Sequence, residues 1–462
     1  GTGAKPTIEY LQVAEEDRGS GACLKAFGVG VTVAKFDRYT FCGTDEAPNE
    51  TQKNEIEKFA PGGERGKEKP EEEGSLESIP VLQAPVAIII HLPKGCTASA
   101  EFKEGEKIIK LSRLVLRDDT LEDIYRGELN TWKEVIEEEE GVDKLKCTGG
   151  EPEETKEIIR VVRKDKSGTT HIFKEFLASA NRLNGAGEEN ALAEEKWIEK
   201  PAVERTWREV ASGPENAEWP EAAKVVRPAG NGNAEVVAKV AAEESSIAYA
   251  NLADVFENGA FDKKSLGGGE KQVKFWVELQ KKTTAPFTYA DPAAKKDTET
   301  AGNANCGKTV YTDGKEVFPP KNTRRLWNTA QSKLNVLSYS LCGLTYDLAL
   351  RQYGKYHDEL EEKGAQPTEA QATTVESYLL YEVNTKTAGG GKVIAENHEY
   401  EKLPSTLLKE VETGIKEIGY NVSGVKFTCT KEAVEGTGTL FYKTLKECET
   451  LNAPGSKGLY HR

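Results

Sequence analysis

The chain has 462 residues, a formal net charge of −15, 37% hydrophobic residues and 30% charged residues. This length allows one large domain or two or three ordinary ones, each with an ample core. The acidic balance argues against a nucleic-acid-binding protein, for which a basic surface is expected. It does not argue against a small anionic ligand, because a local site can be positive within a negative whole.

The longest apolar run, IPVLQAPVAIIIHLP at 79–93, is shorter than the roughly 20 residues of a membrane span. Its glutamine, its prolines and its β-branched residues predict buried strands instead. The chain contains no methionine, not even at position 1. We therefore expect a processed product from which a signal peptide has been removed.

The eight cysteines are dispersed and form no CxxC pair, and the five histidines are scattered, so the spacing of a zinc site is absent. An even, dispersed set in an exported chain predicts disulfides. The simplest pairing joins neighbours in the sequence: Cys23 with Cys42, Cys96 with Cys147, Cys306 with Cys342, and Cys429 with Cys448. The alternative is eight free thiols in a cytosolic protein.

Strand-like and helix-like segments alternate along the chain, which predicts an α/β fold with mostly parallel sheets. The expected strands are 7–13, 36–48 with its closing turn, 79–93, 158–165 and 338–350. The expected helical segments are 19–27, 112–139, 167–183, 373–385 and 403–419, and 225–255 is expected to form a strand, a helix and a second strand. Residues 260–335 are rich in Lys, Thr, Asn, Gly and Pro, which predicts a loop-rich insertion.

Three strands run into small polar turns that open helices: RGSGACL at 18–24, KSGTTHI at 166–172 and GNGNAEV at 230–236. A helix N-terminus exposes about four unpaired N–H groups and a partial positive charge. Glycine lets an anion approach the backbone, and hydroxyls add donors, so each turn fits a phosphate- or sulfate-sized anion. Taken singly, each turn is also compatible with an ordinary helix cap.

The second turn carries further signals. Arg163 lies four residues before Ser167 and can offer a rigid fork of donors to a tetrahedral oxyanion, and Asp165 can hold that guanidinium in place. The alternative is a salt bridge at a surface strand end.

Asp45, in FCGTDEAP at 41–48, adds a charge of the opposite sign. A carboxylate repels a dianion unless the anion brings a proton to donate. Hydrogen phosphate carries one at neutral pH and sulfate does not, so an acceptor in the site favours phosphate.

An ordered set of motifs resembles the phosphate-binding proteins of the periplasm. It comprises GSGACLKAF, FCGTDEAP, IPVLQAPVAIIIHLP, LEDIYRGELNTW, RVVRKDKSGTTHIF, GNGNAEVVAKV and SSIAYANL. The chain looks like the solute-binding subunit of an ABC-type phosphate importer, in the type II periplasmic-binding-protein superfamily. The similarity covers roughly 7–255 and, loosely, 336–462.

The resemblance implies two α/β lobes joined by crossing strands, with inorganic phosphate bound between them. Lobe 1 would comprise 1–87 plus 343–462, and lobe 2 would comprise 88–342, with 260–335 as an insertion. Phosphate contacts would fall on Ser20, Asp45, Arg163, Ser167, Gly168 and Thr169, with Asp165 beside the arginine. The implied partner is a membrane permease, the implied location is extracytoplasmic, and no cofactor, metal or catalysis is implied. Neither a GxSxG elbow nor paired catalytic carboxylates stand out, so we expect no enzyme.

The chain departs from the family pattern at its start and at Lys166, where the family usually has glycine. Only 19 residues precede Ser20, so the family's first strand–helix unit is expected to be absent. An empty slot in the first lobe's sheet would accept a strand from another copy. This gives an alternative function, a cell-surface or filament subunit assembled by strand exchange with weak or no phosphate binding. A third reading is that the segment was cleaved or belongs to a companion polypeptide.

Overall fold

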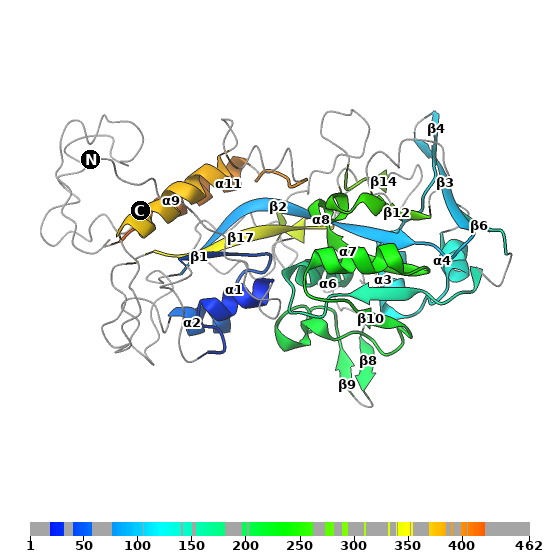
Figure 1. Ribbon diagram of the computed structural model, residues 1–462, viewed down its shortest axis with the longest axis horizontal. Helices are drawn as coiled ribbons and strands as arrows, with labels where there is room; N and C mark the ends of the chain where they lie inside the picture. Colours follow the sequence, from blue (N-terminus) through cyan, green and yellow to red (C-terminus); the bar gives the residue numbers. More distant parts are fainter. Residues whose placement is uncertain are drawn as a thin grey trace, which may run out of the picture.

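The computed structural model shows two lobes joined by two long strands (Figure 1). It describes residues 19–31, 40–57, 76–104, 106–139, 142–149, 154–180, 196–200, 203–261, 273–280, 289–293, 309–310, 331–332, 339, 341–351, 353, 369–384, 390, 399–403 and 405–420. The expected strand at 7–13, the expected absence of a strand–helix unit before Ser20, and the expected strand exchange all fall on residues outside these ranges.

The two joining strands are β2 (Leu76–His91) and β17 (Cys342–Leu350), which pair antiparallel from Leu76↔Leu350 to Pro85↔Cys342. Residues 79–93 were expected to give one or two buried strands, and they lie in and directly after the single strand β2, whose side chains are all buried. Proline donates no ladder hydrogen bond, and the register shifts between Thr345 and Tyr346, opposite Pro80. The shift leaves Val81 of β2 as an extra residue beside Pro80, whereas Pro85 of the same strand keeps a regular pairing with Cys342.

The first lobe packs helices on both faces of the β1–β17–β2 sheet (Figure 1). Its core draws on residues 23–81 and 344–418, so it is built from both ends of the described chain. Its elements besides β2 and β17 are α1 (Ser20–Ala26), β1 (Phe41–Thr44), α2 (Glu50–Glu57), α9 (Glu369–Val383) and α11 (Ser405–Ile415). The helices expected at 373–385 and 403–419 are confirmed by α9 and α11.

The second lobe is centred on the strands β10 (Val226–Pro228), β7 (Ile159–Val162) and β11 (Ser246–Asn251), which are parallel to one another. Strand β11 continues the sheet onto β2 in the antiparallel direction. Successive side chains of β2 point to opposite faces, so Ile88 and Ile90 pack with α6 (Gly168–Ala180) and Ile89 packs with α7 (Asn233–Ala242). A strand covered on both faces must be apolar throughout, as residues 86–90 are.

The remaining elements of the second lobe surround this sheet. They are β3 (Cys96–Glu104), β4 (Lys107–Leu111), β5 (Val115–Leu116), α3 (Asp118–Arg126), α4 (Trp132–Glu138), β6 (Asp143–Cys147), β8 (Trp197–Lys200), β9 (Val203–Arg205), η3 (Gly213–Ala217), α8 (Leu252–Glu257), η4 (Gly259–Phe261), β12 (Lys274–Trp276), β13 (Glu278–Gln280) and β14 (Tyr289–Ala290). The short pair β15 (Thr309–Val310) and β16 (Gln331–Ser332) extends the sheet beyond β17.

The expectation of mostly parallel sheets is wrong for the described residues. Parallel pairing is confined to β10–β7, β7–β11 and β5–β13, and the other ladders are antiparallel. The physical reason is the connection between lobes: β2 leaves the first lobe and β17 returns to it, so the two strands run in opposite directions. Local hairpins such as β3–β4 add further antiparallel pairs.

The segment expected as a loop-rich insertion contributes to the core. Strand β12 pairs with β2 on the side opposite β11, and Phe275 and Val277 are fully buried. Arg113 ties this segment down, because its Nη2 lies 2.5 Å from Glu278 Oε1 and 2.7 Å from Asp291 Oδ2. Its guanidinium also lies over the ring of Trp276. The composition of 260–335 gave no sign of the short strands β12 to β16, which form through pairing with strands elsewhere in the fold and with one another.

Two of the expected disulfides are confirmed, Cys23–Cys42 between α1 and β1 and Cys96–Cys147 between β3 and β6. Cys342 is also disulfide-bonded. Its predicted partner Cys306, and the predicted pair Cys429–Cys448, lie outside the described residues. Within the described ranges, no helix combines the length and apolar character needed to cross a membrane.

A pair of carboxyl groups is buried beneath α9 in the first lobe. Asp347 on β17 and Glu382 on α9 hydrogen-bond to each other, and both are buried. Burial raises the pKa of Asp347 to about 6 and raises the pKa of Glu382 well above its usual value. The folded protein therefore binds these protons more tightly than the unfolded chain does. The contribution of Asp347 to stability is complete below about pH 4 and is lost as the pH rises through about 6, and the contribution of Glu382 is lost as the pH rises through its own raised pKa.

Glu382→Gln keeps a donor for Asp347 and removes the titrating group. We expect the variant to be more stable than the parent chain at pH 7.5, by about 1–3 kcal/mol, and to lose less stability between pH 4 and 7. Urea unfolding at several pH values measures both. Glu369→Gln, at an exposed position of the same helix, is the control. A Glu382→Gln variant less stable than the parent at pH 7.5 would contradict this account.

Candidate functional site

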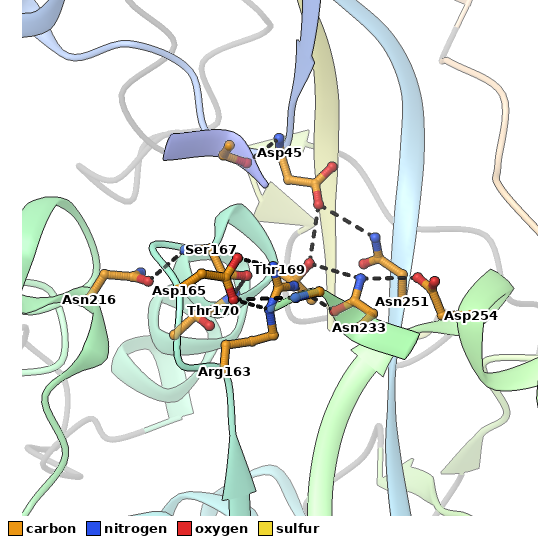
Figure 2. A network of polar contacts seen from close by, with 12 residues as sticks. Asp45, Arg163, Asp165, Ser167, Thr169, Thr170, Asn216, Asn233, Asn251 and Asp254 are labelled. Carbon is orange, nitrogen blue, oxygen red and sulfur yellow. Dashed lines mark hydrogen bonds and ion pairs between the residues drawn. The ribbon is translucent and has the colours of Figure 1, made fainter. Parts of the chain in front are cut away.

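The three polar turns meet where the lobes face each other. The start of α1 and the end of β1 come from the first lobe, and the starts of α6 and α7 come from the second. Figure 2 shows Asp45 from the first lobe pointing toward Thr169, Asn233 and Asn251 of the second. The carboxyl ends of strands and the N-termini of helices thus gather at one place, where α/β folds commonly bind ligands.

The start of α6 is organised by its own side chains. Ser167 Oγ accepts from Thr170 N at 3.2 Å, which caps the helix, and Asn216 Oδ1 accepts from Ser167 N at 3.0 Å. The first intrahelical bond runs from His171 N to Ser167 O. The N–H groups of Gly168 and Thr169 therefore open the helix without an intrahelical acceptor and carry its partial positive charge.

Lys174 keeps Asn216 in reach of this turn. It is fully buried, and its Nζ donates to the carbonyl oxygens of Val210, Asn216 and Glu218 at 2.6–3.1 Å. The ammonium also lies over the ring of Trp219. Satisfying a buried charge with several acceptors offsets much of its desolvation cost. Lys174 therefore fixes residues 210–218 against α6, which keeps the Asn216 side chain within hydrogen-bonding distance of Ser167.

Arg163 follows β7 and is held from two sides (Figure 2). Its Nε and Nη2 donate to the two carboxylate oxygens of Asp165, at 2.7 and 2.5 Å, and its Nη1 donates to Asn233 Oδ1 at 2.9 Å. The side chains of Arg163 and Asp165 are only 4% and 10% exposed, so the pair is hardly screened by water. Arginine has five N–H donors; three are used in these bonds, and two remain.

Asp45 is the acceptor on the opposite side. Its Oδ2 accepts from Thr169 Oγ1 at 3.2 Å and from Asn251 Nδ2 at 3.4 Å. Burial raises the pKa of Asp45 above its usual value, while the hydrogen bonds from Asn251 and Thr169 and the charge of Arg163 oppose that rise. The carboxyl group is thus an acceptor placed among donors of the other lobe.

The two lobes approach each other closely at two glycines. A Cβ on Gly168 would fall within van der Waals distance of Ser20 Oγ and 2.6 Å from Asp45 Cβ. A Cβ on Gly19 would lie 2.7 Å from Asp165 Oδ2, and Gly19 also has a φ of 84°, which favours glycine. Ser20 itself is buried and accepts a hydrogen bond from Asp45 N at 3.1 Å. The starts of α1 and α6 therefore meet face to face.

The structure brings all seven predicted site residues into this one region: Ser20, Asp45, Arg163, Asp165, Ser167, Gly168 and Thr169. Their roles as phosphate contacts stay predictions. Ser167 faces Asn216 and Thr170 with its N–H and hydroxyl. Lys166, the departure from the family pattern, has its Cβ 3.1 Å from where a Cβ on Gly21 would be, so it packs against the start of α1.

Besides Thr170, which directly follows the predicted Thr169, four residues of the network were not predicted: Asn216, Asn233, Asn251 and Asp254. Asn233 donates from Nδ2 to Asp254 Oδ2 at 3.0 Å and to Thr169 Oγ1 at 3.4 Å. The sequence carried a partial signal for two of them, because Asn233 lies in the GNGNAEV turn and Asn251 ends the SIAYAN strand. Nothing local marks Asn216 or Asp254. Within the described residues no three His, Cys, Asp or Glu side chains could together hold a metal ion.

The family model described as the PBP superfamily domain matches residues 2–312, which is well over half of the chain. The chain belongs to the PBP superfamily. The two-lobe α/β architecture of this PBP-superfamily protein agrees with that membership. No curated protein sequence matches the chain significantly.

Several solved structures are similar to this PBP-superfamily protein. One is a high-affinity periplasmic phosphate-binding protein, PfluDING, with phosphate bound: identity 18%, TM-score 0.48, covering 87% of this chain and 91% of that one. Another is a human phosphate-binding apolipoprotein, with 15% identity, a TM-score of 0.49 and 86% of each chain covered. A third is an ABC-type phosphate transport receptor from Vibrio cholerae, with 13% identity, a TM-score of 0.34, and 84% and 86% covered.

Gly168→Ala tests the close contact of the lobes. Because alanine is favoured within helices, we expect α6 to form and the melting temperature to stay within about 3 °C of the parent. The added methyl group would press on Ser20 and Asp45, so the lobes should separate and the radius of gyration should rise in small-angle X-ray scattering. Gly259→Ala is the control, because a Cβ there meets nothing within 4 Å. An unchanged radius of gyration in Gly168→Ala would rule out a tight lobe contact.

Proposed function

We propose that the protein binds hydrogen phosphate between its two lobes, without chemistry, as the extracytoplasmic solute-binding subunit of an ABC-type importer. The observation that carries this proposal is the placement of Arg163. It is anchored by Asp165 and Asn233, it lies beside the N-terminus of α6, and it faces the acceptor Asp45 across the lobe interface. The proposal agrees with the phosphate-binding proteins named above but rests on this geometry and on the motif set.

The charges of the region suit an anion that carries a proton. The Arg163 charge is shared with Asp165, and the start of α6 adds a partial positive charge with two N–H donors. Asp45 offers lone pairs and no proton when ionised. Hydrogen phosphate can donate its proton to Asp45 and accept from every other group, whereas sulfate would place an oxygen against the Asp45 carboxylate.

Binding would use the two joining strands as the hinge. We propose that the lobes are 1–87 plus 343–462 and 88–342. The core changes from one lobe to the other between Cys342 and Leu344 on β17, at this boundary, and between Val81 and Val86 on β2, a few residues before it. Phosphate would take over donors that now bridge the lobes, such as the Thr169 hydroxyl, so the anion would stabilise closure. A membrane permease is the implied partner. Assembly by strand exchange stays a prediction on residues 1–18.

Calorimetric titration of the purified chain with phosphate, and with sulfate as control, tests the proposal. We expect phosphate to bind in preference to sulfate. Arg163→Lys should weaken binding at least a hundredfold, about 2.7 kcal/mol, because the three N–H donors of an ammonium cannot replace the two bonds to Asp165, the bond to Asn233 and the donors left for the anion. Arg227→Lys, at a half-exposed salt bridge on β10, is the matched control and should bind as the parent does. Failure of the parent chain to bind phosphate would reject the function.

Asp45→Asn tests the acceptor. An amide offers a donor to sulfate and removes the fixed negative charge, so we expect the preference for phosphate over sulfate to fall at least tenfold. Competition titrations of the two anions measure the ratio of dissociation constants directly. Asp119→Asn, at an exposed position of α3, should leave the ratio unchanged. An Asp45→Asn variant with the parent's ratio would remove Asp45 from the specificity of the site.

A further inference from the structure

The third polar turn, GNGN at 230–233, contributes to the site through Asn233 and through Gly232, whose N–H donates to Asp165 Oδ1 at 3.4 Å. Gly232 precedes α7 with a φ of 93°, and Asn233 is the first residue of the helix. The Asn233 side chain does not cap its own helix. It reaches across to Arg163 after β7, to Thr169 at the start of α6 and to Asp254 in α8. Asparagine is a weak helix former, so this position is explained by those three contacts and not by helix formation.

The orientation of the Asn233 amide is fixed by the charges around it (Figure 2). Oδ1 accepts from Arg163 Nη1 at 2.9 Å, and Nδ2 donates to Asp254 Oδ2 at 3.0 Å and to Thr169 Oγ1 at 3.4 Å. Rotating the amide by half a turn would set its NH₂ group against the guanidinium and its oxygen against the Asp254 carboxylate. The rotated form is therefore disfavoured on both sides.

This one side chain connects the cation of the site to a hydroxyl of the site. Asp165 holds the edge of the guanidinium formed by Nε and Nη2, and Asn233 holds Nη1, so the plane of the guanidinium is fixed at both ends. Thr169 Oγ1 accepts from Asn233 Nδ2 and donates to Asp45 Oδ2, which sets the direction of its hydroxyl hydrogen. The Asn233 oxygen is already engaged with Arg163 and would repel an anion, so Asn233 acts through its neighbours.

We propose that Asn233 is a positioning residue for phosphate, which orients the Arg163 guanidinium and the Thr169 hydroxyl through a single amide anchored by Asp254. This inference rests on the proposed function. It accounts for the third turn, and it assigns Asp254 a role as the anchor of Asn233. Burial raises the pKa of Asp254, while the hydrogen bond from Asn233 opposes that rise.

Three variants test the proposal by calorimetric titration with inorganic phosphate. Asn233→Ala removes all three contacts, and we expect phosphate to bind at least tenfold more weakly. Asn233→Asp keeps an acceptor for Arg163 but places a carboxylate against Asp254, so binding should weaken as well. The double variant Asn233→Asp with Asp254→Asn reverses that hydrogen bond and restores the charge of the pair. It should bind at least fivefold more tightly than Asn233→Asp alone.

A second readout follows Arg163 itself without phosphate. In protein labelled with ¹⁵N-arginine, the two Nη groups of a guanidinium held at both ends should give separate NMR signals. In Asn233→Ala the Nη signals of Arg163 should broaden or average, because only Asp165 still holds the group. Thr131→Ala is the control: it removes the cap of α4 in the same lobe, away from the network, and should change neither the signals nor phosphate affinity.

The outcomes separate the two proposals. If the parent chain does not bind phosphate, the proposed function fails, and with it the role in phosphate binding, while the NMR signals still decide whether Asn233 holds Arg163. If the parent binds and Asn233→Ala binds equally well, the positioning role is overturned. Equal weakening by Asn233→Ala and Thr131→Ala would also overturn it, because it would mark a general loss of stability. A double variant no better than Asn233→Asp would remove Asp254 from the account.

Discussion

The candidate site depends on one buried ion pair, Arg163 with Asp165. A guanidinium this poorly exposed to water costs free energy unless its charge is matched, and the carboxylate two residues further along matches it with two hydrogen bonds. The pair occupies one edge of the guanidinium and leaves the other side for further acceptors. Asn233 accepts from Nη1 on that other side, and the remaining N–H donors of Arg163 lie near the start of α6. A strongly acidic protein thereby holds the positive guanidinium of Arg163 in a fixed position in the candidate site.

A second constraint arises because two helix N-termini meet at the lobe interface. The starts of α1 and α6 both carry partial positive charge, and Gly19 and Gly168 leave no side chain between them. Such an arrangement needs negative charge or lone pairs close by. Asp45 supplies them in the structure by accepting from Thr169 and Asn251. An anion that carries its own proton could therefore bind between the two helix starts and donate that proton to Asp45, so the aspartate can stay in place.

The architecture follows from how the lobes are connected. Strand β2 runs from the first lobe into the second, and β17 enters the first lobe beside it, so any relative movement of the lobes must be taken up where these two strands cross between them. Their antiparallel pairing stabilises a ribbon that has a bulge at Val81, next to Pro80. Each lobe has its own core on either side of the ribbon. The site lies beside this connection. The distance between the starts of α1 and α6 therefore depends on the geometry of β2 and β17.

The sequence by itself determined what depends on neighbouring residues. Residues 158–180 form the strand β7, a charged and hydroxyl-rich turn and the helix α6. They do so because β-branched residues, the capping residue Ser167 and a largely apolar helical segment follow one another directly in the sequence. The disulfide Cys23–Cys42 could be predicted from the sequence for the same reason, because its two cysteines lie on consecutive elements, α1 and β1. The tertiary structure alone decided contacts between distant segments: the meeting of Asn233 with Arg163, the place of Asn216, and the pairing of β12 with β2. Local propensity and capping are properties of a short stretch, whereas these contacts depend on how β2 and β17 bring separate turns together, and no single stretch encodes that.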